Sequence, residues 1–241
     1  ISFINFLNRS KVRNYFTWDD DFKKRKKLNI KSSLNKFKNE LRDSDYIVLS
    51  PGINLKKSKL NKQLKKNKSK IISDLDLFYM SNSTNKSIVV TGTNGKSTTC
   101  KIVEHLLNKN KIHSKLGGNI GRPILSLKLK KNSFIIIEAS SFQLAYSKFV
   151  RPNYAILLNL TKDHLDWHNT MKHYSDSKFK IFNLQTRDSF AFISEKNLIK
   201  KFKKKGYLSK LKIVSDNSYN KIKNKLNNNY LKFGANNSNM S

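Results

Sequence analysis

The segment from Ile88 to Thr99 constrains the fold of this chain more than any other feature. It reads Ile-Val-Val-Thr-Gly-Thr-Asn-Gly-Lys-Ser-Thr-Thr, an apolar run that enters a turn with two glycines and continues into a helical pattern. Glycines let backbone N–H groups approach an anion closely, and the N-terminus of the following helix adds positive potential. The strict phosphate-loop pattern is not met, because Val90 stands where its first glycine would be. The segment still predicts a phosphate-binding turn, with Lys96 reaching terminal phosphates and the Ser97 hydroxyl available to Mg²⁺.

Short apolar runs alternate with longer helical patterns along the rest of the chain, which is typical of an α/β protein with a mostly parallel sheet. One helix is expected over Thr98–Asn108, where apolar residues recur at helical spacing. The predicted strands are Tyr46–Leu49, Ser87–Thr91, Phe134–Glu138 and Ala155–Asn159, with weaker ones at Phe190–Ser194 and Lys212–Ser215.

A polar stretch at residues 81–85 separates a lysine-rich first part from the strand that leads into the glycine turn. We therefore expect two domains, residues 1–84 and residues 85–241. The stretch from Asn227 to Ser241 is rich in Asn and Ser and lacks a closing apolar element. It is expected to fray, or to have been cut from a domain that follows.

The chain is strongly basic, with 49 Lys and Arg residues against 16 Asp and Glu residues and a formal net charge of +33. The arginines are few and scattered and the lysines form no single block, so we interpret the charge as a compositional bias and expect no specific nucleic acid. The resulting positive field favours anionic small molecules such as nucleotides. A basic phosphate-loop ATPase that depends on nucleic acid is the alternative from another class.

A single cysteine, Cys100, excludes an intrachain disulfide and fits a reducing compartment. No apolar run approaches the ~18 residues that a membrane span needs. We therefore expect a cytoplasmic protein without membrane insertion, and a monomer.

Two further groups follow predicted strands. Glu138 ends one strand, and it is read either as a solvated strand end or as a Mg²⁺ ligand; the phosphate turn on the neighbouring element favours the second reading. Asp163 and His164 follow another strand, where the histidine could bind a divalent ion or orient a carboxylate. His168 could share a helical face with His164, but no His-Glu-x-x-His pattern accompanies it, so zinc is not favoured. Three other histidines, His105, His113 and His173, are expected at the surface.

Four segments in this order resemble the Mur ligase family. They are Thr-Gly-Thr-Asn-Gly-Lys-Ser-Thr from Thr91, Gly-Gly-Asn-Ile-Gly from Gly117, Glu-Ala-Ser-Ser-Phe-Gln-Leu from Glu138 and Asn-Leu-Thr-Lys-Asp-His-Leu-Asp from Asn159. The second and third segments point, within the family, to the member that adds D-glutamate to UDP-N-acetylmuramoyl-L-alanine. The resemblance covers roughly residues 1–195. It implies a partial Rossmann-like, UDP-substrate-binding first domain, a central phosphate-loop-type ATP-binding domain, and the absence of the extreme N-terminus and of the C-terminal domain, so that this chain alone would be inactive.

The resemblance also implies a reaction and its residues. The reaction is ATP-dependent amide formation through an acyl phosphate in peptidoglycan precursor synthesis, with Lys96, Glu138, His164 and Lys178 as catalytic residues. Lys178 matches a lysine that reacts with CO₂ to give a carbamate, although Lys180 lies close by; Ser97, Glu138, His164 and Lys178 would hold Mg²⁺. ATP would contact Gly92, Thr93, Asn94, Gly95, Lys96, Ser97 and Thr98. The muramoyl substrate would contact Asn119, Ser140 and Gln143, with Ser50 and Gly52 facing the uridine diphosphate. Another Mur ligase, or a folylpolyglutamate synthase-type ligase, remains the alternative within this class.

Overall fold

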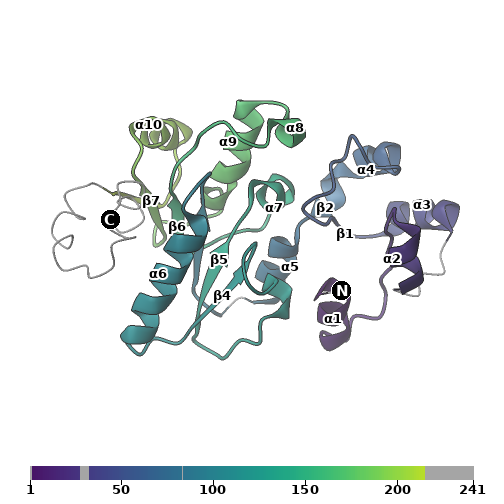
Figure 1. Ribbon diagram of the computed structural model, residues 1–241, viewed down its shortest axis with the longest axis horizontal. Helices are drawn as coiled ribbons and strands as arrows, with labels where there is room; N and C mark the ends of the chain where they lie inside the picture. The colour runs from purple at the N-terminus through teal and green to yellow at the C-terminus, as the bar shows by residue number, and fades with distance from the viewer. Residues whose placement is uncertain (1, 28–32, 83, 215–241) are drawn as a thin grey trace.

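A computed structural model describes residues 2–27, 33–82 and 84–214 of the chain, and its main feature is a six-stranded sheet (Figure 1). All neighbouring strands run parallel, in the order β4-β5-β3-β6-β7-β8. The strands are β3 Ser87–Thr91, β4 Ser114–Gly118, β5 Phe134–Glu138, β6 Tyr154–Leu157, β7 Phe190–Ile193 and β8 Lys210–Ile213. The predicted α/β class with a mostly parallel sheet is confirmed.

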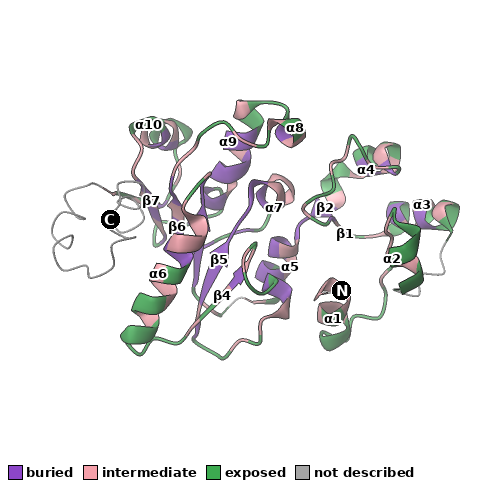
Figure 2. Cartoon of the chain, in the orientation of Figure 1, coloured by how far each residue is buried: buried purple, intermediate pink, exposed green. Residues whose placement is uncertain are grey.

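Helices cover both faces of this sheet because its central strands are apolar on both sides. In β3, Ile88 and Val90 pack on the face covered by α6, where they meet Cys100, whereas Val89 packs on the opposite face. Figure 2 shows the central strands as buried and much of α6 as exposed. The helices of this part are α5 Asp74–Ser81, α6 Lys96–Lys109, α7 Ser141–Tyr146, α8 Leu165–His168, α9 Met171–Phe179 and α10 Lys196–Lys205, with 3₁₀ turns η2 Ile124–Ser126 and η3 Lys180–Phe182.

The first part of the chain forms a separate, two-stranded parallel sheet from β1 Ile47–Val48 and β2 Ile71–Ile72. Its own buried cluster includes Phe37, Leu41 and Leu64. The elements around it are α2 Phe22–Lys27, α3 Leu34–Asp43, α4 Asn61–Lys66 and the 3₁₀ turn η1 Lys68–Lys70. The first helix, α1 Ser2–Arg9, packs through Phe3 and Phe6 against the core of the large sheet instead. The helix α5, although it precedes residue 84, packs into the core of the large sheet through Leu75 and Phe78. The domain boundary near residue 84 stays a prediction.

The predicted strands Ser87–Thr91 and Phe134–Glu138 are confirmed at both ends. The other predicted strands are found within one or two residues, with Ser215 lying outside the described residues. The strand Ser114–Gly118 was not predicted, because it ends in two glycines, which have low strand propensity. The predicted stretch 227–241 also lies outside the described residues. No helix in the described part of the chain is both long and apolar enough to cross a membrane.

Candidate functional site

The strand order brings three loops together at the carboxyl edge of the large sheet. After β3 the chain builds β4 and β5 on one side of it, then crosses to place β6 on its other side. Such a reversal opens a crevice at the carboxyl ends of the strands, where ligands of open α/β sheets bind. The loops that meet there follow Thr91, Glu138 and Leu157.

The first loop, residues 91–98, is called the phosphate loop below. Gly95 has a left-handed conformation with φ of 82°, which favours glycine, and α6 begins at the next residue. The loop is fastened to the loop after β6: the N–H of Asn94 donates to Asn159 Oδ1 at 2.8 Å, and Asn159 Nδ2 donates to the Asn94 carbonyl at 3.1 Å. The N–H of Thr93 also donates to the Asn159 carbonyl at 3.0 Å. Asn159 therefore fixes the turn from outside.

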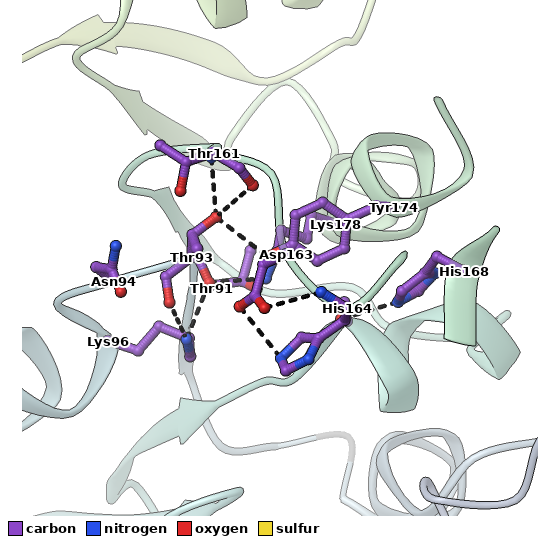
Figure 3. Close-up of polar contacts among 12 residues, drawn as sticks. Thr91, Thr93, Asn94, Lys96, Thr161, Asp163, His164, His168, Tyr174 and Lys178 are labelled. Carbon is purple, nitrogen blue, oxygen red and sulfur yellow. Dashed lines mark hydrogen bonds and ion pairs between the residues drawn. The ribbon is translucent and has the colours of Figure 1, made fainter. Parts of the chain in front are cut away.

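The side chain of Lys96 folds back over the phosphate loop (Figure 3). Its Nζ donates to the carbonyls of Gly92 at 3.0 Å and Thr93 at 2.7 Å. Burial lowers the pKa of Lys96, while Glu138 and Asp163 act in the opposite direction. The ammonium is thus held at the turn by carbonyls and nearby carboxylates, where it can meet an anion.

Glu138 lies at the centre of a second set of contacts and is 2% exposed. Its Oε2 accepts a hydrogen bond from Ser97 Oγ at 2.7 Å, and its Oε1 accepts one from Asn119 Nδ2 at 2.9 Å. The backbone N–H of Asn119 also donates to the Glu138 carbonyl at 2.8 Å. Three residues that the sequence assigned to metal and substrate are therefore brought together.

The approach of β4 to Glu138 depends on a glycine. Gly118 has φ of 111°, and a Cβ there would lie 2.3 Å from the Glu138 carbonyl oxygen. A larger residue would push the Gly-Gly segment away from Glu138. Gly118 therefore serves the contact with Glu138, whereas a Cβ on Gly117 would lie 2.8 Å from the Arg122 carbonyl oxygen.

His164 lies at the third loop and is about half exposed. It has a left-handed backbone with φ of 51°, and its Nε2 lies 3.3 Å from Asp163 Oδ2 (Figure 3). The ring packs against Phe142 of α7, with 4.8 Å between ring centroids. No hydrogen bond or ion pair among the described residues joins His164 directly to Glu138 or Ser97.

Lys178 reaches the phosphate loop from α9, and it is 2% exposed. Its Nζ donates to the Gly92 carbonyl at 2.7 Å and lies 3.4 Å from Thr91 Oγ1, with the Tyr174 ring beneath it. Burial, and then the charge of Lys96, lowers the pKa of Lys178 to about 7. A lysine with that pKa is partly neutral near pH 7, as a nucleophilic amine must be.

The neighbouring Lys180 points elsewhere. Its Nζ donates to the carbonyls of Ala145 at 2.5 Å and Ser147 at 3.1 Å, at the end of α7. Burial lowers its pKa to about 8. Of the two lysines that the sequence left open, the geometry therefore favours Lys178 at the site.

The residues expected to contact a muramoyl substrate are divided between two places. Ser140 and Gln143 form a capping box at the start of α7, and Gln143 Nε2 also donates to both carboxylate oxygens of Asp74 at 3.1 and 3.0 Å. Ser50 and Gly52 lie in the turn after β1, on the small sheet. No hydrogen bond or ion pair in the described ranges joins Ser50 or Gly52 to the phosphate loop.

Sequence reasoning missed a contact between two histidines. His168 is 1% exposed; its Nδ1 lies 3.1 Å from Nδ1 of His173, and its Nε2 lies 3.0 Å from Ser141 Oγ. Burial, and then His173, lowers the pKa of His168 to about 4, so the ring is neutral near pH 7. His173 is exposed, as expected, but its ring contacts His168. A spacing of five across a helix break gives no periodic signal that could have revealed the pair.

The donor set at this edge suits a hard cation. Ser97 Oγ and the carboxylate of Glu138 are oxygen donors of the kind that Mg²⁺ prefers. Within the described residues, no group of three or more His, Cys, Asp or Glu side chains could hold a metal ion by itself. A cation here would therefore need further oxygen ligands from a bound nucleotide, from water or from a modified side chain.

Fold and site together define a three-layer α/β protein with a phosphate-loop-type turn at the carboxyl edge of a parallel sheet. The sequence pattern of the Mur ligase middle domain matches residues 90–240. The chain belongs to the Mur ligase family.

Two relatives agree with this assignment by sequence. A UDP-N-acetylmuramoylalanine--D-glutamate ligase of Rickettsia felis is 45% identical over 153 residues, which are 64% of this chain and 34% of that protein. The ligase of the same name from Pseudothermotoga lettingae is 31% identical over 196 residues, 78% of this chain and 44% of that protein. A solved UDP-N-acetylmuramate:L-alanyl-gamma-D-glutamyl-meso-diaminopimelate ligase from Neisseria meningitides aligns with a TM-score of 0.49 and 15% identity, over 83% of this chain and 68% of that one. The matched part of the chain spans less than half the length of the Rickettsia felis and Pseudothermotoga lettingae ligases.

Proposed function

We propose that this chain supplies the ATP-binding part of an enzyme that joins D-glutamate to UDP-N-acetylmuramoyl-L-alanine through an acyl phosphate, a step of peptidoglycan precursor synthesis. One observation carries the nucleotide part of the proposal: the turn at Gly95 leads into the N-terminus of α6, and the carbonyls of Gly92 and Thr93 hold the Lys96 ammonium at that turn. A cation held at a turn before a helix N-terminus creates a local preference for a polyphosphate. The names of the relatives supply the amino acid and the acceptor.

In this proposal ATP contacts residues 92–98, with Lys96 on its terminal phosphates. Mg²⁺ would be held by Ser97 and Glu138, with His164 and a carbamate of Lys178 as further ligands. The partly neutral amine of Lys178 supports this last role, because CO₂ reacts with the unprotonated form. Bound ATP supplies the phosphoryl group that activates the substrate carboxylate. The residues of the chain contribute charge neutralisation and alignment, which dominate phosphoryl transfer.

The proposed substrate residues come from two parts of the chain. Asn119, Ser140 and Gln143 would contact the muramoyl peptide, since all three lie on segments that adjoin Glu138. Ser50 and Gly52 would face the uridine diphosphate from the small sheet. The turn that contains them is joined to α7, because the Tyr146 hydroxyl donates to the Ile53 carbonyl at 2.6 Å. The proposed enzyme acts as a monomer in the cytoplasm, where nucleotide-linked wall precursors are made.

The nucleotide part is tested on this chain by calorimetric titration with ATP and Mg²⁺. Lys96→Ala should weaken binding on the order of a hundredfold, because a charged hydrogen-bonding group is worth about 1.5–3 kcal/mol. Lys101→Ala, on the exposed side of the same helix, is the matched control and should bind like the wild type. Equal affinity in Lys96→Ala and Lys101→Ala would contradict the assignment of the phosphate loop.

The amide-forming part is tested in a chimera in which residues 85–214 replace the matching stretch of the Rickettsia felis relative. Phosphate release from ATP should require both UDP-N-acetylmuramoyl-L-alanine and D-glutamate, and should disappear in the Lys96→Ala chimera. Phosphate release that does not depend on either compound but rises with added RNA or DNA would contradict the proposed ligase activity and favour a nucleic-acid-dependent ATPase. The unaltered relative provides the reference rate.

A further inference from the structure

The buried histidine of α8 lies where three elements of the site meet. His168 contacts Ser141 of α7 through Nε2 and His173 of α9 through Nδ1, at 3.0 and 3.1 Å. Its ring lies parallel to that of Phe142, with an interplanar angle of 9° and 5.6 Å between centroids. Its backbone N–H donates to the carbonyl of His164 at 3.0 Å, within α8. One side chain therefore joins α7 to α9 and also supports the residue against which His164 packs.

A neutral imidazole suits this position because it carries one donor and one acceptor. Whichever nitrogen of His168 holds the proton, the other can accept from its partner, since the hydroxyl of Ser141 and the ring of His173 can each act in either sense. Both polar contacts of the buried ring are thus satisfied. An apolar residue of similar size would leave Ser141 without this partner in a buried place.

The elements that His168 joins carry the proposed metal ligands. The ring of Phe142 is shared, since it packs on His168 and, at 4.8 Å, on His164. The helix α9 begins two residues before His173 and ends one residue after Lys178. The Tyr174 ring lies 5.2 Å from that of His168 and beneath the Lys178 ammonium at 4.8 Å. A shift of His168 would therefore move both His164 and Lys178 relative to the phosphate loop.

We infer that His168 is a positioning residue of this site: by linking Ser141 to His173 and stacking on Phe142, it holds His164 and Lys178 in register with the phosphate loop. The role given to His164 and Lys178 rests on the proposed function. Partners that orient metal ligands from outside typically change metal affinity or activity by about 10–100-fold when they are replaced. His168 itself touches neither nucleotide nor metal in this inference.

The test compares ADP binding to this chain in Mg²⁺ and in EDTA. His168→Phe keeps a ring for Phe142 but removes both nitrogens, whereas His168→Gln retains an amide that can reach Ser141. We expect the gain in ADP affinity that Mg²⁺ provides to fall about tenfold in His168→Phe and to recover in part in His168→Gln, while affinity in EDTA stays within about twofold of the wild type. His105→Phe, at an exposed position of α6, is the control and should retain the full gain.

Two outcomes would overturn the inference. One is a His168→Phe variant in which Mg²⁺ raises the affinity for ADP as much as it does in the wild type. The other is an equal loss of affinity in Mg²⁺ and EDTA, which would show a general role in folding instead of a role at the metal ligands.

Failure of the proposed function would look different, because the wild type itself would bind no ADP. In that case the ring signals of His164 in ¹H–¹⁵N NMR spectra still test the positioning role without a nucleotide. A changed His164 signal in His168→Phe, with the exposed His113 unchanged, supports it, and an unchanged His164 signal rejects it.

Discussion

The phosphate loop and the α8–α9 region, residues 163–179, approach the same point by different means. The phosphate loop is continuous in sequence, and backbone groups supply much of its geometry: the turn at Gly95, the start of α6 and the carbonyls that hold Lys96. The α8–α9 region reaches that loop through side chains, above all the buried Lys178 and Tyr174. Its internal contacts are mostly between rings, such as His168 against Phe142 and His173.

The difference shows how a site divides its tasks. Backbone geometry at a glycine turn is rigid and local, so it suits the binding of phosphate groups whose shape does not vary. Long side chains from a packed helix can change their charge through burial, as Lys178 does, so they suit chemistry that needs a tuned group. The hydroxyl contact of Thr93 with Tyr174, at 3.0 Å, joins the two regions.

The largest effect should come from replacing Gly118, the last residue of β4, whose backbone lies against Glu138 beside the phosphate loop. Gly118→Ala would place a Cβ 2.3 Å from the Glu138 carbonyl oxygen at a positive φ, so we expect a loss on the order of 4 kcal/mol in the free energy of unfolding. Gly121→Ala is the matched control, with φ of 68° and open space around it, and should cost only about 1 kcal/mol. Urea unfolding measures both; equal losses would mean that the close approach to Glu138 is not what requires glycine.

The next effect concerns the α8–α9 region and is seen as a dependence on pH. The folded state releases the proton of Lys178 near pH 7, whereas the unfolded chain keeps it to about 10.5. Between these values the folded state binds fewer protons, so its stability rises with pH, by on the order of 3 kcal/mol from pH 7 to 10.

Lys178→Met removes the contribution of Lys178 to the pH dependence of the free energy of unfolding. The difference between wild type and variant separates this contribution from the titration of the many other lysines. Urea unfolding at pH 7, 8.5 and 10 measures it. Lys180→Met is the control for a second buried lysine, because its pKa of about 8 gives a smaller rise over the same range. Parallel pH curves for wild type and Lys178→Met would refute the lowered pKa of Lys178.

The smallest effect concerns the hydroxyl contact that joins the two regions. A double-mutant cycle of Thr93→Val and Tyr174→Phe removes the hydroxyl contact from either side, and we expect a coupling free energy of about 1 kcal/mol in urea unfolding. Thr93→Val paired with Ser189→Ala, a buried hydroxyl near β7 that bonds Thr186, provides a reference cycle that should show no coupling. Coupling near zero in the first cycle would mean that the two regions are held together by other contacts.

The sequence predicted the parts of the site whose residues are close in the chain. The phosphate turn, the strand that ends in Glu138 and the strand before His164 all appear as apolar runs followed by polar groups, and the structure places them at one edge. The strand at Ser114–Gly118 was not predicted because glycines indicate turns, and only the structure shows that Gly118 lies against the Glu138 carbonyl, where a Cβ would not fit. The choice of Lys178 over Lys180 needed the resemblance to a family, and the geometry then gave it a physical reason.

By itself the sequence determined the α/β class, the buried strands and the phosphate turn, because hydrophobic period and glycine conformation act over a few residues. Tertiary structure alone decided which groups change their chemistry. The lowered pKa of Lys178, the hydrogen bonds that Gln143 donates to Asp74 and the pair of His168 with His173 arise from burial and from partners distant in sequence or across a helix break. Desolvation depends on the whole surrounding fold, and no local pattern of residues records it.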